Sequence, residues 1–408
     1  MAQEFALSGM TVVDIGVRPS TAWCSRLLAD FGAEVIMVEP DGGHPLRAHP
    51  PFDDAGRSIP SRYFLANKAS GSRDLRDTLI ESADIIVTSS LEGAVLARRN
   101  AGAIVCAITP HGQDGAYKDF PGNDLTAAAR SGWAYVNGLK SRAPLKGSGY
   151  QASFQAGTLA YGAIVCAMIE RLANGAEGQL IDISELETLV STSAPASLRV
   201  QYSGFVWPRR EKVDMNEGPV PVADGYFALP LSRPDFWRKA MQVFELPDLA
   251  EDKELQQPGL RHKFKDRYVE RVHEKMLGWR RMELFKALGD LRVVAGPVLR
   301  MDEMGENPQF DGRDFFVRPA SGPAGSPPGS QSGSNVRFPG AFAHMGYSDW
   351  SLNHEMPEVG VRREPFAAGE VSTTPVRAGG VRAGTVIARG KGPLSGFRGL
   401  VLTQAWAG

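Results

Sequence analysis

Cysteine is scarce in this sequence, and neither sign of charge is in excess. Its 408 residues include three cysteines, too few and odd in number for a disulfide framework, so reduced thiols are expected. Lys and Arg total 45 against 46 Asp and Glu, and this balance gives no indication of a nucleic-acid or membrane surface. The seven histidines are scattered without partners at metal-ligand spacing, and no P-loop or catalytic-triad pattern is present.

Long hydrophobic runs are also lacking. The longest, residues 156–169, ends at Glu170 and Arg171, which makes it short for a membrane span and normal for a buried helix. The first residues, MAQEFALSG, contain no basic segment followed by an apolar one, so no signal peptide is expected. These features favour a cytoplasmic protein without a membrane partner.

What the sequence does contain is an alternation of short apolar strands and helices. Strands are expected at residues 10–15, 34–38, 83–89 and 103–109. A strand, a helix and a second strand within about 30 residues form a βαβ unit, which predicts an α/β fold with a parallel sheet. Gly16 follows the first strand, but no G-x-G-x-x-G pattern surrounds it, so NAD or FAD binding is not expected.

The stretch from Gly149 to Glu187 is the most informative. It predicts a long apolar helix over residues 154–172 and a strand over residues 179–183. A second helix is expected to begin at Ser184, with Glu187 at the spacing of a capping box.

This stretch resembles the class III CoA-transferase family, which includes formyl-CoA transferase, the carnitine CoA-transferases and α-methylacyl-CoA racemase. The family pattern is A-D-x-x-x-G, an apolar helix, G-x-G-Q, and then V-D-[IV]-[SA] followed by E. The chain matches it with Ala152, Gly157, Gly178-Gln179, Asp182-Ile183-Ser184 and Glu187. Further similar segments lie at residues 27–40, 109–124 and 291–309.

The resemblance implies a large Rossmann-like domain with a parallel sheet, a smaller α+β domain, and two subunits interlocked like links. It places the first part of the large domain at 1–199, the small domain at 200–318, a flexible Pro-, Gly- and Ser-rich linker at 319–334, and the return to the large domain with a C-terminal tail at 335–408. Within the tail, residues 394–402 echo residues 7–15. If the chain descends from a tandem fusion, the tail is expected to pair as an extra strand or to lie on a partner; the alternative is a disordered remnant.

Two positions depart from the family in a way that bears on chemistry. Ser153 stands where the transferases have the Asp that becomes acylated, and Asn123 stands where the racemases have an acid/base His. An amide does not titrate near pH 7, and a hydroxyl needs a base beside it. The sequence neighbours of Ser153 offer no base, and the chain shows no gained titratable group that would mark a site with new chemistry. Because a hydroxyl forms a stable ester instead of an anhydride, Ser153 is expected only to fill the space of the lost carboxylate.

The resemblance also implies contacts with CoA, expected as a substrate and not as a tightly bound cofactor. Val17 and Arg18 replace the family's A-G-P loop, and Met37 replaces a cation near the CoA phosphates, so Arg18 is a candidate for that charge. The other expected contacts are Asn67, Lys68, Gly112, Gln113, Gly115 and Asp124. Asn67 and Lys68 equally fit a helix start, and the glycines a surface turn.

Three functions remain open. The first is a subunit of a class III CoA-transferase, inactive alone, that moves CoA between an acyl-CoA such as succinyl-CoA and a carboxylic acid. It would work with a paralogous subunit that keeps the Asp, similar to the Asp-lacking subunit of the heteromeric benzylsuccinate CoA-transferase. The second is a lyase or isomerase acting on a CoA thioester, and the third is a CoA-thioester-binding protein without turnover.

Overall fold

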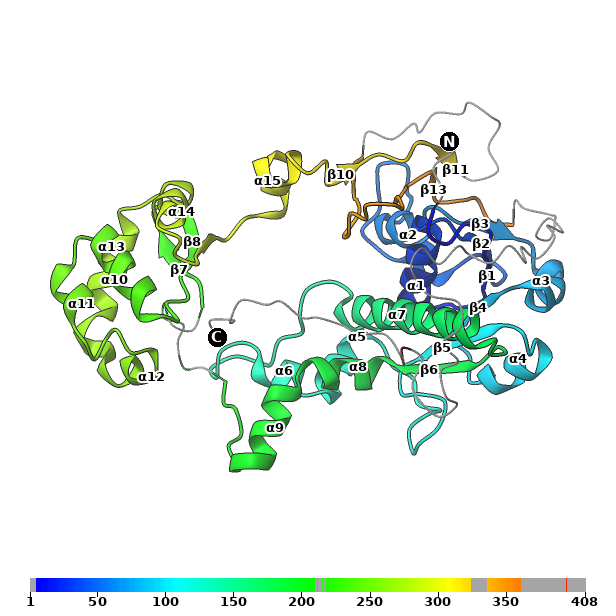
Figure 1. Cartoon of the computed structure of the whole chain (residues 1–408), viewed down its shortest axis with the longest axis horizontal. Helices are drawn as coiled ribbons and strands as arrows, with labels where there is room; N and C mark the ends of the chain where they lie inside the picture. Colours follow the sequence, from blue (N-terminus) through cyan, green and yellow to red (C-terminus); the bar gives the residue numbers. More distant parts are fainter. Residues whose placement is uncertain are drawn as a thin grey trace. The chain divides into compact units, whose positions relative to one another are not determined.

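The structure is a computed structural model that describes residues 5–209, 211, 215, 218–323, 336–360 and 394 (Figure 1). The described residues divide into two compact units: 5–137, 144–207 and those from 309 onward form the first, and 138–143 with those in 208–308 form the second. The predicted limit between residues 199 and 200 lies inside helix α9 (Ala194–Ser203), whereas this division follows residue 207. The predicted domain limits stay predictions.

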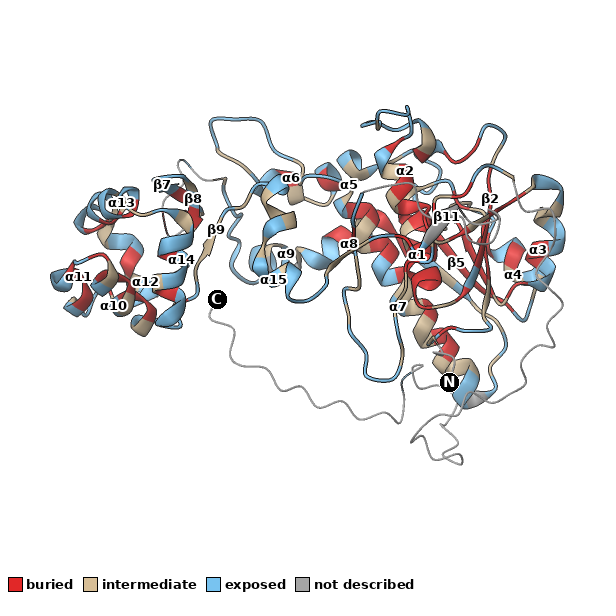
Figure 2. Cartoon of the chain, turned by 90° about the horizontal axis from the view of Figure 1, so that it is seen from above, coloured by how far each residue is buried: buried red, intermediate tan, exposed pale blue. Residues whose placement is uncertain are grey.

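A six-stranded sheet organises the first unit, with the strand order β3-β2-β1-β4-β5-β6. Every neighbouring pair in it is parallel. The strands are β1 (Thr11–Asp14), β2 (Glu34–Val38), β3 (Ala69–Gly71), β4 (Ile85–Thr88), β5 (Ile104–Thr109) and β6 (Leu180–Ser184). Most residues of these strands are buried, drawn red in Figure 2, as is typical of a parallel sheet covered on both faces. The predicted α/β fold with a parallel sheet is confirmed.

Helices α1 (Pro19–Asp30) and α7 (Gln151–Asn174) pack against each other beside the sheet. They approach closely at Gly157, where a Cβ atom would lie 2.6 Å from the carbonyl oxygen of Ser20. The close approach explains the glycine at this point of the pattern. The other helices of the unit are η1 (Pro45–Ala48), α2 (Ile59–Phe64), η2 (Arg73–Leu75), α3 (Arg76–Ser82), α4 (Gly93–Arg99), α5 (Asp124–Arg130), α6 (Trp133–Val136), α8 (Glu185–Thr192) and α9.

Helix α7 is long and apolar enough to cross a membrane by length and composition, with a mean hydropathy of 1.5 over Gln151–Ala173. One such helix is weak evidence, because the core helix of a folded unit has the same properties. Here Ala156, Ala160 and Ile164 are fully buried in the core that α7 shares with α1 and the sheet. The absence of a membrane partner stays a prediction.

The second unit has a separate core. An antiparallel sheet of β7 (Val220–Val222), β8 (Gly225–Ala228) and β9 (Gly296–Pro297) packs with the helices around Trp237 and Tyr268, both fully buried. The helices are α10 (Pro234–Val243), α11 (Pro247–Glu251), α12 (Pro258–Arg261), η3 (His262–Arg267), α13 (Val269–Leu277), α14 (Arg281–Asp290) and η4 (Met301–Glu306), with α15 (Pro308–Asp311) at the boundary.

The chain then returns to the first unit. Strand β10 (Phe316–Val317) pairs with β12 (Phe338–Pro339), and β11 (Ser321–Pro323) pairs with β13 (His354–Glu355). Three residues that we expected in the flexible linker therefore form β11. Residues 324–334 of that linker lie outside the described residues, as does the tail strand expected at 394–402 apart from Leu394.

Candidate active site

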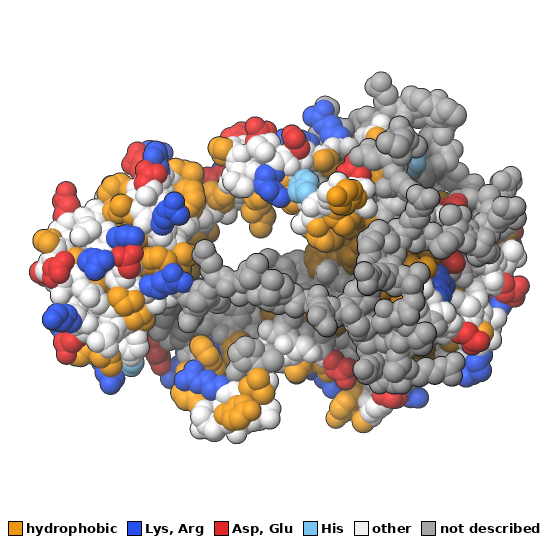
Figure 3. All heavy atoms as spheres, in the orientation of Figure 1, with side chains coloured by type: hydrophobic (Ala, Val, Ile, Leu, Met, Phe, Trp, Pro, Cys, Tyr) orange, Lys and Arg blue, Asp and Glu red, His pale blue; other side chains and the backbone are white. Residues whose placement is uncertain are grey.

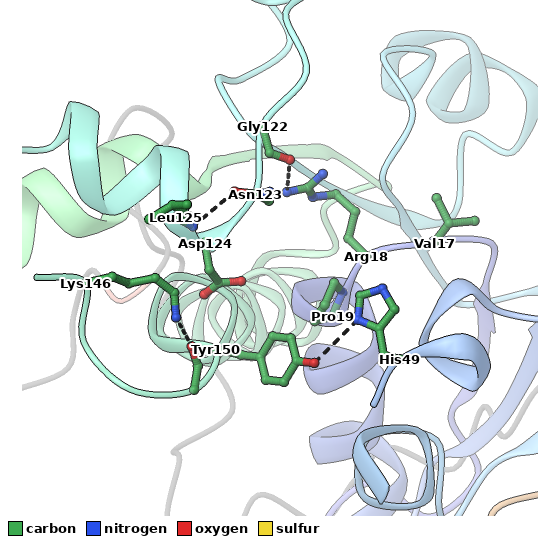
Figure 4. Close-up of a pocket in the computed structure, with 11 residues that line it drawn as sticks. Val17, Arg18, Pro19, His49, Gly122, Asn123, Asp124, Leu125, Lys146 and Tyr150 are labelled. Atoms are coloured by element: carbon green, nitrogen blue, oxygen red, sulfur yellow. Dashed lines mark hydrogen bonds between the residues drawn. The ribbon is translucent and has the colours of Figure 1, made fainter. Parts of the chain in front are cut away.

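A pocket of about 490 Å³ opens in the first unit, at the carboxyl ends of β1 and β5. In an open parallel sheet this is the edge where ligands bind. The pocket is drawn in Figure 4 and is lined by Val17, Arg18, Pro19, His49, Gly122, Asn123, Asp124, Leu125, Lys146, Gly149 and Tyr150. Four residues expected at a ligand site, Val17, Arg18, Asn123 and Asp124, are thus brought together.

Arg18 lies at the start of α1, and its guanidinium is engaged within the protein. Its Nε and Nη2 donate to the two carboxylate oxygens of Glu185, at 2.9 and 2.5 Å, and Nη2 also donates to the carbonyl oxygen of Gly122 at 3.0 Å. Glu185 is fully buried and accepts a further hydrogen bond from Ser20 at 2.6 Å. Arg18 therefore reaches the pocket with its charge balanced by Glu185, and its role toward a phosphate stays a prediction.

Asn123 caps helix α5. Its side-chain oxygen accepts hydrogen bonds from the backbone N–H groups of Leu125 and Thr126, at 3.0 and 3.1 Å. This satisfies two of the N–H groups left open at a helix start. The cap fixes the first turn of α5, so the next side chain, Asp124, is held toward the pocket.

Ser153 lies in the first turn of α7 and is fully buried. Its backbone N–H donates to Oδ1 of Asp124 at 3.1 Å, and its hydroxyl donates to Oδ2 of the same carboxylate at 2.7 Å. The sequence neighbours of Ser153 offer no base, but the fold brings the Asp124 carboxylate against its hydroxyl. The partner comes from a segment 29 residues earlier in the chain, and sequence neighbours alone could not reveal it.

Lys146, His49 and Tyr150 complete the polar part of the pocket, and sequence reasoning missed all three. The Lys146 ammonium donates to the carbonyl oxygens of Gly147 and Gly149, at 3.1 and 2.5 Å. The His49 Nδ1 lies 3.4 Å from the Tyr150 hydroxyl. Burial, and secondly the charge of Asp124, raise the pKa of Tyr150. These residues belong to loops and follow no sequence pattern that we recognise.

Lys68 and Asn67 lie away from this pocket. The Lys68 side chain has no exposed surface, and its ammonium donates to the carbonyl oxygen of Ala22 and to the Ser25 hydroxyl, both at 2.7 Å. Asn67 donates to Asp30 Oδ1 at 2.8 Å and accepts from the backbone N–H of Asn353 at 2.9 Å. The described contacts of both side chains are internal, so their predicted contact with CoA gains no support and stays a prediction.

Gly112, Gln113 and Gly115 follow β5 and do not line the pocket either. Both glycines have positive φ, 92° and 86°, which explains their residue type as turn geometry. The Gln113 side chain donates to the carbonyl oxygen of Ser90 at 3.0 Å, and its oxygen accepts from the N–H of Gly93 at 3.2 Å. Among the residues that the structure describes, no group of three or more His, Cys, Asp or Glu side chains could hold a metal ion.

The chain is similar to known proteins along most of its length. Residues 7–362 match the model of CoA-transferase family III. The succinate–glutarate CoA-transferase of Agrobacterium fabrum is 29% identical over 340 residues, which are 76% of this chain and 84% of that protein. The subunit BbsE of the succinyl-CoA:(R)-benzylsuccinate CoA-transferase of Thauera aromatica is 27% identical over 403 residues, 88% of this chain and 92% of that one.

The fold has solved counterparts as well. A CAIB/BAIF family protein from Brucella suis superposes with a TM-score of 0.75 and 23% identity, over 88% of this chain and 97% of its own. The family model, the curated relatives and the parallel sheet agree with the resemblance seen at residues 149–187. This chain belongs to CoA-transferase family III.

Proposed function

We propose that this chain is a subunit of a CoA-transferase that moves CoA between an acyl-CoA, such as succinyl-CoA, and a carboxylic acid. A paralogous subunit that keeps the family Asp is responsible for catalysis at the full rate. The observation that carries the proposal is Ser153, fully buried and committed to Asp124, at the position of the family nucleophile. A buried hydroxyl that donates to a carboxylate has no access to a substrate in the pocket.

The relatives support both the chemistry and the partner. Two of the relatives are named for dicarboxylic acids. One is a succinate–glutarate CoA-transferase, and the other acts on benzylsuccinate. The second is named as a subunit, so that protein works in a larger enzyme. We extend this to the present chain as an interlocked heteromer in the cytoplasm.

The surface of α9 and the segment after it also fits a partner. Exposed apolar side chains gather there with a basic one, as the lower part of Figure 3 shows. Arg199 lies over the rings of Phe205 and Trp207, with its Cζ atom 3.9 and 5.0 Å from the ring centroids, and Tyr202 is 88% exposed. Exposed apolar clusters with aromatic residues and Arg are typical of protein interfaces.

The test is co-expression with the Asp-bearing paralogue and a steady-state transferase assay with succinyl-CoA and a dicarboxylic acid. Exchange of the paralogue's Asp for Ala is expected to abolish turnover. Ser153→Asp in this chain is expected not to abolish turnover of the pair, because the paralogue supplies the carboxylate that becomes acylated. Ser153→Ala is the matched control without the added charge. Normal turnover by the purified homomer would contradict the proposal.

A CoA-thioester-binding protein without turnover is the second candidate, favoured by the intact pocket. Isothermal titration with succinyl-CoA separates the two. Binding that is the same with and without the paralogue, combined with no transferase activity of the pair, is the result expected for the binding protein. A lyase or isomerase would instead convert the CoA thioester without an acceptor acid.

A further inference from the structure

The carboxylate of Asp124 is oriented by two donors and is open to the pocket. Oδ1 and Oδ2 each accept one hydrogen bond from Ser153, one from its backbone and one from its hydroxyl. Figure 4 shows the carboxylate pointing into the space bordered by Pro19, Lys146 and Tyr150. Of the residues that line the pocket, Asp124 alone carries a carboxylate.

The two hydrogen bonds fix the carboxylate without removing its charge. Both donors are neutral, and an ionised carboxylate can accept about four hydrogen bonds, so lone pairs on both oxygens remain free for the pocket. Arg18 does not neutralise Asp124, because its guanidinium is bound to Glu185. Lys146 lines the same pocket, where a cation can stabilise negative charge that develops on a bound acyl group.

We propose that Asp124, and not Ser153, is an acyl acceptor of this chain. One carboxylate oxygen of Asp124 bonds to the carbonyl carbon of a CoA thioester bound in the pocket, the C–S bond breaks, and its electron pair leaves on the sulfur as CoA thiolate. The product is a mixed anhydride on Asp124, and the step needs no proton transfer, oxidant or reductant. Ser153 acts as a positioning residue that aims the carboxylate.

This inference goes beyond the proposed function, since it gives the chain a covalent step of its own. It does not require turnover: an acyl group held on Asp124 of the chain alone is compatible with a paralogue that carries the full transferase rate. The two ideas therefore fail independently, one in an acylation measurement on this chain and the other in turnover by the pair.

The experiment incubates the full chain with succinyl-CoA and follows acylation by intact-protein mass spectrometry. Hydroxylamine then converts an aspartyl anhydride into a hydroxamate, and peptide mapping locates it. We expect a succinyl adduct on the wild type, a hydroxamate at Asp124, and at least a tenfold loss of adduct in Asp124→Asn. Asp119→Asn makes the same change at an exposed carboxylate that does not line the pocket, and is expected to leave acylation unchanged.

Ser153→Ala separates the two candidate acceptors. It keeps the Asp124 carboxylate and removes its hydroxyl donor, so the adduct is expected to form more slowly and still at Asp124. Loss of the adduct in Ser153→Ala together with a hydroxylamine-resistant ester at Ser153 in the wild type would overturn the proposal. So would an unlabelled wild type, a label on another residue, or undiminished labelling of Asp124→Asn. Peptide mapping of the wild type decides the matter even where a variant fails to fold.

Discussion

Two carboxylate–serine pairs in the first unit share their chemistry and differ in their surroundings. The Ser25 hydroxyl donates to Asp14 Oδ2 at 2.5 Å, and the Ser153 hydroxyl donates to Asp124 Oδ2 at 2.7 Å. The Asp14 pair is buried in the first unit. The Lys68 ammonium lies 3.4 Å from Asp14 Oδ2, and the Lys68 side chain has no exposed surface. The Asp124 pair opens on the pocket, and among the described residues no ion pair is formed by Asp124.

The difference indicates which pair supports the fold and which is free for chemistry. Burial lowers the pKa of Lys68, and the charge of Asp14 opposes this shift. Each of the two charges thus depends on the other, because an unpaired charge in the interior is costly. Asp124 faces the pocket on one side and accepts hydrogen bonds from the neutral donors of Ser153, so it does not depend on a buried cation. We expect substitutions in the two regions to separate accordingly.

The largest difference is expected between Lys68→Met and Lys146→Met. Removing Lys68 leaves Asp14 buried without its cation, and breaking a buried pair in this way costs about 3–5 kcal/mol of unfolding free energy. Lys146 is half-buried and donates only to backbone carbonyl oxygens of its own loop, so the same exchange is expected to cost less than about 1 kcal/mol. Urea denaturation of both variants measures the two losses. Equal losses would remove the distinction between the regions.

A second test uses pH and the buried side chain of His44. Burial lowers the pKa of His44 to about 4, against an ordinary value of about 6.5 in an unfolded chain. The charges of Asp14 and Glu39 raise it, and those of Lys68 and Arg47 lower it further. Since the folded pKa lies below the unfolded one, the unfolded chain takes up the proton first. Stability is therefore lost as the pH falls from about 6.5 to about 4.

The expected loss from His44 across this window is about 3 kcal/mol. It is measured as the difference between wild type and His44→Asn, whose side-chain oxygen is able to accept the hydrogen bond that His44 Nδ1 accepts from the N–H of Leu46. Urea denaturation at pH 7 and at pH 4 gives the two free energies. Parallel pH curves for the two proteins would show that His44 is not held neutral by the fold.

The fold could be predicted from the sequence in large part. The long helix expected over residues 154–172 is α7, Gln151–Asn174, and the strand expected over 179–183 is β6, Leu180–Ser184. The cap expected at Ser184 is confirmed, since its hydroxyl accepts from the N–H of Glu187 at 3.2 Å. These features depend on residues close together in the chain, where apolar periodicity and capping act.

The site could be predicted only in part, because it depends on contacts between distant segments. The family pattern pointed to Ser153 and Asp124 separately, but nothing in the sequence states that they touch. It also pointed to Lys68, whose contacts with Asp14 and Ser25 are internal. A sequence motif therefore indicates which residues recur in a fold. The three-dimensional arrangement is needed to distinguish residues that contact a ligand from residues that stabilise the structure.

The smallest difference in unfolding free energy is expected when serine is replaced by alanine in each pair. This is also the most direct comparison, because the substitution is the same. Ser25→Ala removes a hydroxyl that links the buried side chains of Asp14 and Lys68. Because the site is buried, the lost hydrogen bonds are not replaced, and the unfolding free energy is expected to fall by about 2 kcal/mol. Ser153→Ala also removes a donor to a carboxylate, but Asp124 keeps the Ser153 N–H and water in the pocket can supply another donor, so the loss is about 1 kcal/mol. Urea denaturation measures both at pH 7. A loss in Ser153→Ala as large as in Ser25→Ala would mean that the Asp124 carboxylate is closed to water, and a carboxylate closed to water is equally closed to a thioester.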